Sequence, residues 1–299
     1  DHTETGLARA GHPDDDPVRG EGVGVDPDLV AGSLVRRGVD LAAEEELCHA
    51  ATVVGPRSGQ AGARRSASSA TPHFGTVDGV TFTGIPAEVL DFYERLKADN
   101  SKTFWEANKV TYRDVVKATA VDLASALDAY GSFHLFRPHN DLRFSKNKPP
   151  YKTHQGAYTE GDGGTGYYFQ ISAQGLMCGS GYYGMAKDQL DRFRRAVDAE
   201  STGAEIGAIV ADLAKRRYRV GAIDELKTAP RGYPKDHPRI ELIRRKGLMA
   251  SKDFGAPKWL HGKQVVTKVR DTWEGAAAMN EWLDTHVGPS TLEPEGFFG

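Results

Sequence analysis

Residues 1–73 contain no aromatic residue and no Lys, Ile, Asn or Met. The 12 Phe, 11 Tyr and 4 Trp of the chain all lie at or after Phe74. A segment of this composition cannot bury enough apolar surface to offset the entropy of ordering its backbone. Residues 1–73 therefore read as a disordered extension, or as a spurious one from upstream or mis-framed DNA, since the missing types have AT-rich codons. This excludes a single globular domain of 299 residues and leaves a folded region, the body of the protein, over residues 74–299.

Cysteine is almost absent, because the chain has only Cys48 and Cys178, one on each side of residue 73. This excludes a disulfide framework within the body and a zinc site built on paired cysteines. No apolar run approaches the length that spans a bilayer. The acidic first residues also lack the apolar region of a secretory signal. We expect a cytoplasmic protein with no membrane partner.

The body carries almost no net charge. It holds 31 basic and 29 acidic residues, whereas residues 1–73 hold 7 Arg and 12 acids. A near-neutral body excludes a protein that coats nucleic acid through its overall field, so any such binding has to come from a local patch.

Apolar spacing predicts an α+β fold. Helical spacing occurs over residues 86–100, 101–131, 190–197, 206–213, 240–243 and 276–286. Strand-like segments occur over residues 133–137, 142–145, 166–172, 176–183 and 259–269, and the third and fourth of these form a hairpin. We expect one domain over residues 74–287, with an antiparallel sheet of hairpins packed by N- and C-terminal helices. Residues 288–299 are expected to be a flexible tail.

The strongest chemical signal is a basic segment, residues 143–152. Four cations and two hydroxyl side chains follow Asp141 with no further acid: Arg143, Lys146, Lys148 and Lys152, with Ser145 and Tyr151. Two consecutive prolines stiffen the segment, so less entropy is lost when it holds a ligand. Such a cluster suits a phosphate, a nucleotide or a nucleic-acid backbone. In the structural alternative Arg143 pairs with Asp141 or Glu106, Tyr151 packs and the lysines are solvated.

Four ordered motifs resemble one known family, a conserved bacterial and fungal domain of unknown function, DUF2461. They occupy residues 100–109, 140–153, 166–181 and 226–233. The chain departs from the family pattern at Asn140, Asn147 and Pro149, where the family usually has Arg, Asp and Thr. The resemblance implies a shared fold and a common site without an established activity. It also implies Lys227 and Arg231, in the last motif, as further ligand residues.

Other patterns favour structural roles. The GxGxxG sequence at residues 179–184 is expected to allow a bulge or a close backbone approach, because its strand belongs to a hairpin. Tyr167 and Phe169 share one strand face and Tyr168 the other, which allows a base-stacking platform, although packing is commoner. No histidine spacing matches a metal site. The basic runs at residues 215–219 and 244–246 are expected to be solvated helix ends.

We therefore expect a domain that binds a phosphorylated or otherwise anionic ligand through residues 143–152, with no residue assigned a catalytic role and no cofactor indicated. Two alternatives remain open. One is a metal-dependent enzyme acting on nucleotides or nucleic acid, with Asp141 as acid or metal ligand. The other is a protein–protein interaction module without catalysis, which requires an exposed apolar patch.

Overall fold

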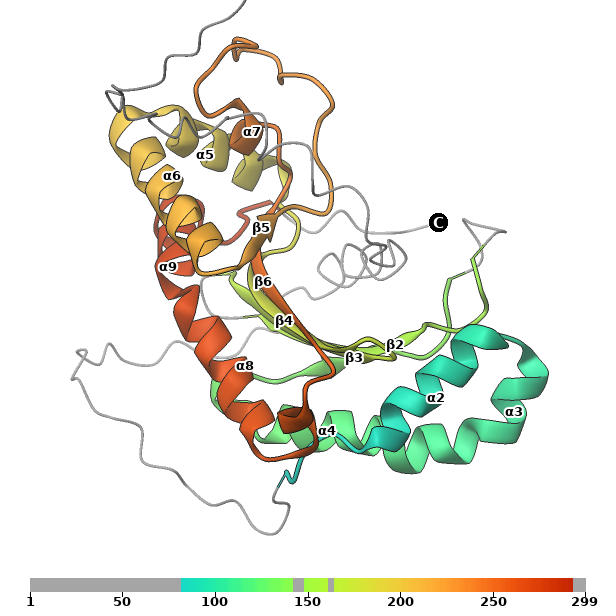
Figure 1. Ribbon diagram of the computed structural model, residues 1–299. Helices are drawn as coiled ribbons and strands as arrows, with labels where there is room; N and C mark the ends of the chain where they lie inside the picture. The colour runs from blue at the N-terminus through green and yellow to red at the C-terminus, as the bar shows by residue number, and fades with distance from the viewer. Residues whose placement is uncertain (1–81, 142–147, 161–163, 293–299) are drawn as a thin grey trace, which may run out of the picture. The chain divides into compact units, whose positions relative to one another are not determined.

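The computed structural model describes residues 82–141, 148–160 and 164–292. The predicted extension at residues 1–73 and the predicted strand at residues 142–145 lie outside these ranges. The α+β fold class is confirmed, since helices flank a six-stranded sheet in which every pairing is antiparallel (Figure 1).

The N-terminal helices form as their apolar spacing predicts. Helix α2 (Ala87–Ala98) buries Val89, Phe92, Tyr93 and Leu96, the spacing of one helix face. Helix α3 (Lys102–Thr111) is capped by Ser101, whose Oγ accepts a hydrogen bond from the backbone N–H of Phe104 at 3.1 Å. The helix expected over residues 101–131 continues through a π-helical turn, η2 (Tyr112–Lys117), and α4 (Ala118–Ser125) to the 3-10 turn η3 (Asp128–Tyr130).

The sheet has the strand order β1-β2-β3-β4-β6-β5. Its strands are β1 (His134–Leu135), β2 (His154–Glu160), β3 (Gly166–Ser172), β4 (Gly175–Tyr182), β5 (Arg219–Gly221) and β6 (Leu248–Gly255). The predicted hairpin is the pair β3–β4. Strands β1 and β5 lie at opposite edges, so the segments next to them are separated by the width of the sheet.

The strand predicted over residues 259–269 is wrong. These residues form a 3-10 turn, η4 (Lys258–His261), and the start of helix α8 (Gln264–Gly275). Val265 and Val269 are both fully buried and lie four residues apart, which is a helical and not an alternating spacing. Strand β6 was not predicted, because it carries charged residues and lacks a regular alternation of apolar side chains.

One face of the sheet is covered by helices. Its strands contribute buried residues to two apolar clusters, one with α2, α4 and α8 and one with α5 (Lys187–Asp198), α6 (Glu200–Lys215), α7 (Ile240–Ile243) and α9 (Ala277–His286). Figure 1 shows α8 and α9 running beside β4 and β6. Helix α9 ends at His286, next to the domain end expected at residue 287.

The glycines of the GxGxxG sequence fit the structural interpretation. Gly179 and Gly181 lie within β4, and Gly184 is exposed after it. A Cβ atom on Gly179 would lie 2.7 Å from the carbonyl oxygen of Ala250 on β6, and Gly181 has φ +135°. The close approach of the two backbones therefore requires glycine at both positions.

Candidate functional site

The described residues of the basic segment, 148–152, lie at the end of a hairpin formed by β1, β2 and the residues that continue them. Beyond β1 the backbone pairing continues from Phe136 N–H to Gly156 O at 2.9 Å and from Lys152 N–H to Pro138 O at 2.8 Å. The last bond joins Asn140 N–H to Pro150 O at 2.9 Å. The loop that carries the cations is thus closed at its base by a regular antiparallel ladder.

Asn100 fixes this base to the junction between α2 and α3. Its Nδ2 donates to the carbonyl oxygen of Tyr151 at 2.9 Å, and its Oδ1 accepts from the Tyr151 N–H at 3.0 Å. One carboxamide therefore satisfies both backbone groups of a residue that would otherwise pair with another strand.

Aromatic packing adds a second attachment. The ring of Tyr151 stacks on the indole of Trp105, with centroids 4.4 Å apart and planes within 9°. The ring of His139, opposite Tyr151 in the hairpin, lies 5.0 Å from Tyr151 and 5.7 Å from Trp105. These contacts join residues from two of the motifs shared with the family, so Trp105 and Tyr151 belong to one structural unit.

A buried polar chain adds a third attachment. The Tyr112 hydroxyl donates to Gln155 Oε1 at 2.7 Å, and Gln155 Nε2 donates to the carbonyl oxygens of Phe136 and Gly156. Burial raises the pKa of Tyr112 to about 12, so this donor keeps its proton at neutral pH. Sequence reasoning missed Gln155, because a single polar residue in a strand gives no signal of its partners.

The predicted ligand residues fall into different environments. Arg143, Ser145 and Lys146 lie outside the described residues, and Lys148 is partly exposed at the end of the loop. Lys152 is only 4% exposed, and its Nζ donates to the carbonyl oxygen of His139 at 2.7 Å. Tyr151 is 5% exposed within the stack just described. The observed contacts of Tyr151 and Lys152 therefore hold the base of the hairpin.

Lys227 and Arg231 are exposed in the long loop between β5 and α7. This loop follows the edge strand β5, whereas the hairpin tip adjoins the opposite edge strand β1. The loop is held to the end of α7, where Leu226 N–H donates to Arg244 O at 2.9 Å. Within the described residues, no contact brings either cation to Lys148 or Lys152.

The aromatic hairpin divides its rings between the two faces of the sheet. Phe169 and Tyr167 pack into the apolar core under the helices. Tyr168 lies on the other face, where it forms a small cluster with Phe136 and Tyr158. All three rings of that cluster are less than 10% exposed. A base-stacking platform stays a prediction, and the contacts that are observed are those of packing.

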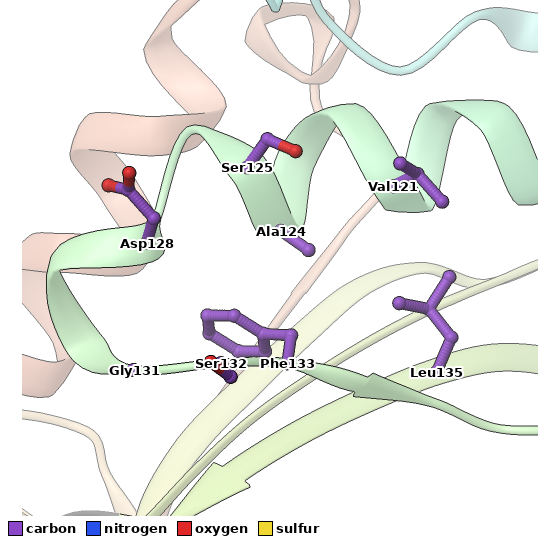
Figure 2. Close-up of a pocket in the computed structure, with 8 residues that line it drawn as sticks. All are labelled: Val121, Ala124, Ser125, Asp128, Gly131, Ser132, Phe133 and Leu135. Carbon is purple, nitrogen blue, oxygen red and sulfur yellow. The ribbon is translucent and has the colours of Figure 1, made fainter. Parts of the chain in front are cut away.

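A groove of about 360 Å³ lies between α4 and the start of β1 (Figure 2). Val121 and Ala124 face Phe133 and Leu135 across it, and its one charged side chain is Asp128. The groove contains none of the predicted ligand residues. In the part of the chain that the structure describes, no three His, Cys, Asp or Glu side chains gather in a way that could hold a metal ion. Over the same residues no helix has the length and apolar character needed to cross a bilayer.

The cations of the first basic run, at residues 215–217 and 219, are exposed as expected, whereas those of the second run are only partly exposed. Tyr218, within the first run, is only 5% exposed, and Lys252 of β6 lies over its ring. In the second run the Nη1 of Arg245 is buried, and burial lowers the pKa of this guanidinium. The second run departs from the expectation because Arg245 pairs with Glu225, so the residues after α7 fold back against the loop that follows β5. Lys252 gave no sequence signal, since the strand that carries it was not predicted.

The model of the family described as "Conserved hypothetical protein (DUF2461)" matches residues 88–282. No curated protein matches the chain, and no solved structure matches it. The match covers well over half of the chain and includes the hairpin, its three attachments and the loop of Lys227. On this evidence the chain belongs to the DUF2461 family.

Proposed function

We propose that this domain binds a phosphate-containing or otherwise anionic ligand at the tip of the β1–β2 hairpin. The observation that carries the proposal is the rigid base of the loop, which is tied to α2, α3 and η2 through Asn100, Trp105 and Tyr112. We expect a base held in this way to reduce the conformational entropy that the segment loses when it holds a ligand.

The proposed roles follow from the chemistry of the side chains and from their places in the sequence. Arg143, Lys146 and Lys148 supply the positive charge, and Ser145 donates a hydrogen bond to the ligand. Tyr151 and Lys152 keep the loop closed, and Lys152 adds its charge from beneath. Lys227 and Arg231 enter only as a separate exposed pair at the far edge of the sheet.

Thermal shift of the full chain tests the proposal. The panel is inorganic phosphate, nucleotides and short nucleic acids, each with the wild type, Lys148→Ala and Lys117→Ala. Lys117 is a matched control, because it is an exposed lysine on η2, away from the hairpin tip. A ligand at 100 times its Kd stabilises by about 2.7 kcal/mol, or roughly 5–10 °C for a domain of this size. The shift should persist in Lys117→Ala and shrink in Lys148→Ala.

Absence of any shift across the panel, or an equal shift in both variants, would count against the hairpin tip as an anion site. The protein-interaction alternative would then gain support. Salt distinguishes a nucleic acid from a small phosphate, because four phosphate contacts to a duplex give a log–log slope of roughly −3 to −4. Dependence of any turnover on a divalent ion would favour the enzyme alternative, with Asp141 as its acid.

A further inference from the structure

Two cations from different elements lie over the ring of Tyr218, next to β5 and so at the opposite edge of the sheet from the hairpin. The Nζ of Lys252, on β6, lies 4.1 Å from the ring centroid, and the Cζ of Arg216, just after α6, lies 5.5 Å from it. Lys268, on α8, is close enough for its charge to lower the pKa of Lys252. The sequence places these three residues 16 or more positions apart, and the fold brings them together.

Two hydrogen bonds hold Tyr218 in place, one from its backbone N–H and one from its hydroxyl. Arg217 has φ 63°, and this left-handed residue reverses the chain so that Tyr218 N–H bonds to Leu213 O at 2.9 Å. The Tyr218 hydroxyl donates to the carbonyl oxygen of Thr272 on α8 at 2.9 Å. These two hydrogen bonds fix the ring of Tyr218, and with it the aromatic surface over which the Lys252 amine lies.

Lys252 is an unusual lysine electrostatically. In the described part of the chain it makes no ion pair with a carboxylate, and it is partly exposed. Burial, the Arg216 guanidinium and Lys268 lower the pKa of its amine, while the Cys178 thiol and Asp271 act in the opposite direction. The net direction is downward, so more of this amine is neutral and nucleophilic at neutral pH than in a solvated lysine.

We propose that Lys252 is a site of direct acylation by acyl phosphates, with Arg216 and Lys268 binding the phosphate of the reagent. The neutral amine of Lys252 attacks the acyl carbon, the bond from that carbon to the phosphate oxygen breaks, and inorganic phosphate leaves with the electron pair. The amine loses one proton to solvent, so the products are an amide, phosphate and a proton. The reaction needs no oxidant or other co-reactant.

Arg216 has the capacity for this role. Its Nη1 bonds to Gly275 O at 3.0 Å and Asp212 Oδ2 at 3.4 Å, which leaves donors of the five-proton guanidinium for a phosphate. Together with Lys268, whose charge also acts on Lys252, Arg216 would supply the two positive charges that favour departure of a phosphate leaving group. Acylation would remove the Lys252 charge and with it the cation–π contact to Tyr218.

The full chain is incubated at pH 7.5 with acetyl phosphate or, in parallel, with acetic anhydride, which is neutral and carries no phosphate. Peptide mass spectrometry follows acetylation at Lys252 and at three exposed lysines, Lys215, Lys235 and Lys263. Acetyl phosphate should modify Lys252 faster than the other three, and inorganic phosphate should slow this reaction by competition. Equal rates at the four lysines would overturn the proposal.

The variants Arg216→Gln and Lys268→Gln separate phosphate binding from a merely reactive amine. Each should lower the ratio of the acetyl phosphate rate to the anhydride rate at Lys252 by roughly two- to fivefold, the effect of one partly exposed ion contact. Lys215→Gln, the adjacent residue on α6, should leave the ratio unchanged. Thermal melting confirms that each variant is folded. A ratio that is the same in wild type and both variants would contradict phosphate binding by these cations.

Discussion

Lys152 and Lys252 are the same residue type in opposite electrostatic settings. The ammonium of Lys152 is almost fully buried and donates to a backbone carbonyl at the base of the hairpin. The ammonium of Lys252 faces an aromatic ring and other cations. The backbone carbonyl stabilises the charged form of Lys152, whereas burial and the neighbouring Arg216 lower the pKa of Lys252 and so destabilise its charged form. The charge of a residue therefore predicts little about its role until its neighbours in the fold are known.

The largest expected change in the free energy of unfolding comes from removing the aromatic packing at the base of the hairpin. Trp105→Ala should lower the free energy of unfolding by about 3–5 kcal/mol, because it removes the stack on Tyr151 and leaves a cavity against Tyr112. Denaturant unfolding measures this. Val110→Ala, on the same helix but 56% exposed, should stay within about 0.5 kcal/mol. Similar values for the two variants would show that the hairpin base does not depend on the indole.

The next largest loss of stability is expected from replacing Asn100, which bonds to both backbone groups of Tyr151. Asn100→Ala should cost about 2–3 kcal/mol, since it leaves both backbone groups of Tyr151 without their partner. Asn100→Asp keeps the acceptor for the Tyr151 N–H but replaces the donor, so it should recover only part of the loss. Full recovery by the aspartate, measured by denaturant unfolding, would mean that the Tyr151 carbonyl does not need this donor.

Replacing each lysine by methionine tests the comparison directly. Lys152→Met should lower the free energy of unfolding by about 2 kcal/mol, because it removes a charged donor from the carbonyl oxygen of His139 while keeping most of the side-chain volume. A change below 0.5 kcal/mol, the usual range of surface substitutions, would place Lys152 in the same class as a solvated lysine.

Lys252→Met should have the smallest effect at neutral pH, within about 0.5 kcal/mol, and a distinctive pH dependence. The pKa of Lys252 is lowered in the folded state, so its charged form opposes folding at low and neutral pH. This penalty is relieved as pH rises toward the ordinary lysine pKa of about 10.4. The wild type should therefore gain stability relative to Lys252→Met over that range. Denaturant unfolding at several pH values measures the difference, and a constant or falling difference would contradict it.

Part of the fold could be predicted because local spacing and tertiary burial agree. Val89, Phe92, Tyr93 and Leu96 have the spacing of a helix face, and all four are buried against the sheet. The β3–β4 hairpin was recognisable for a similar reason, since its turn and β-prone residues lie together in sequence. In contrast, residues 259–269 were assigned to a strand on their β-branched content, although tertiary packing uses Val265 and Val269 as one face of α8.

The sequence by itself determined the α+β class, the family and the position of the basic segment, because these depend on local spacing and on motifs that are contiguous in the chain. Only the tertiary structure decided what individual cations do. The carbonyl that receives Lys152 lies 13 residues away, and the ring beneath Lys252 belongs to Tyr218, 34 residues before it and just ahead of β5. Electrostatic interactions act over a few ångströms of space, and no sequence pattern records which distant residues the fold brings within that distance.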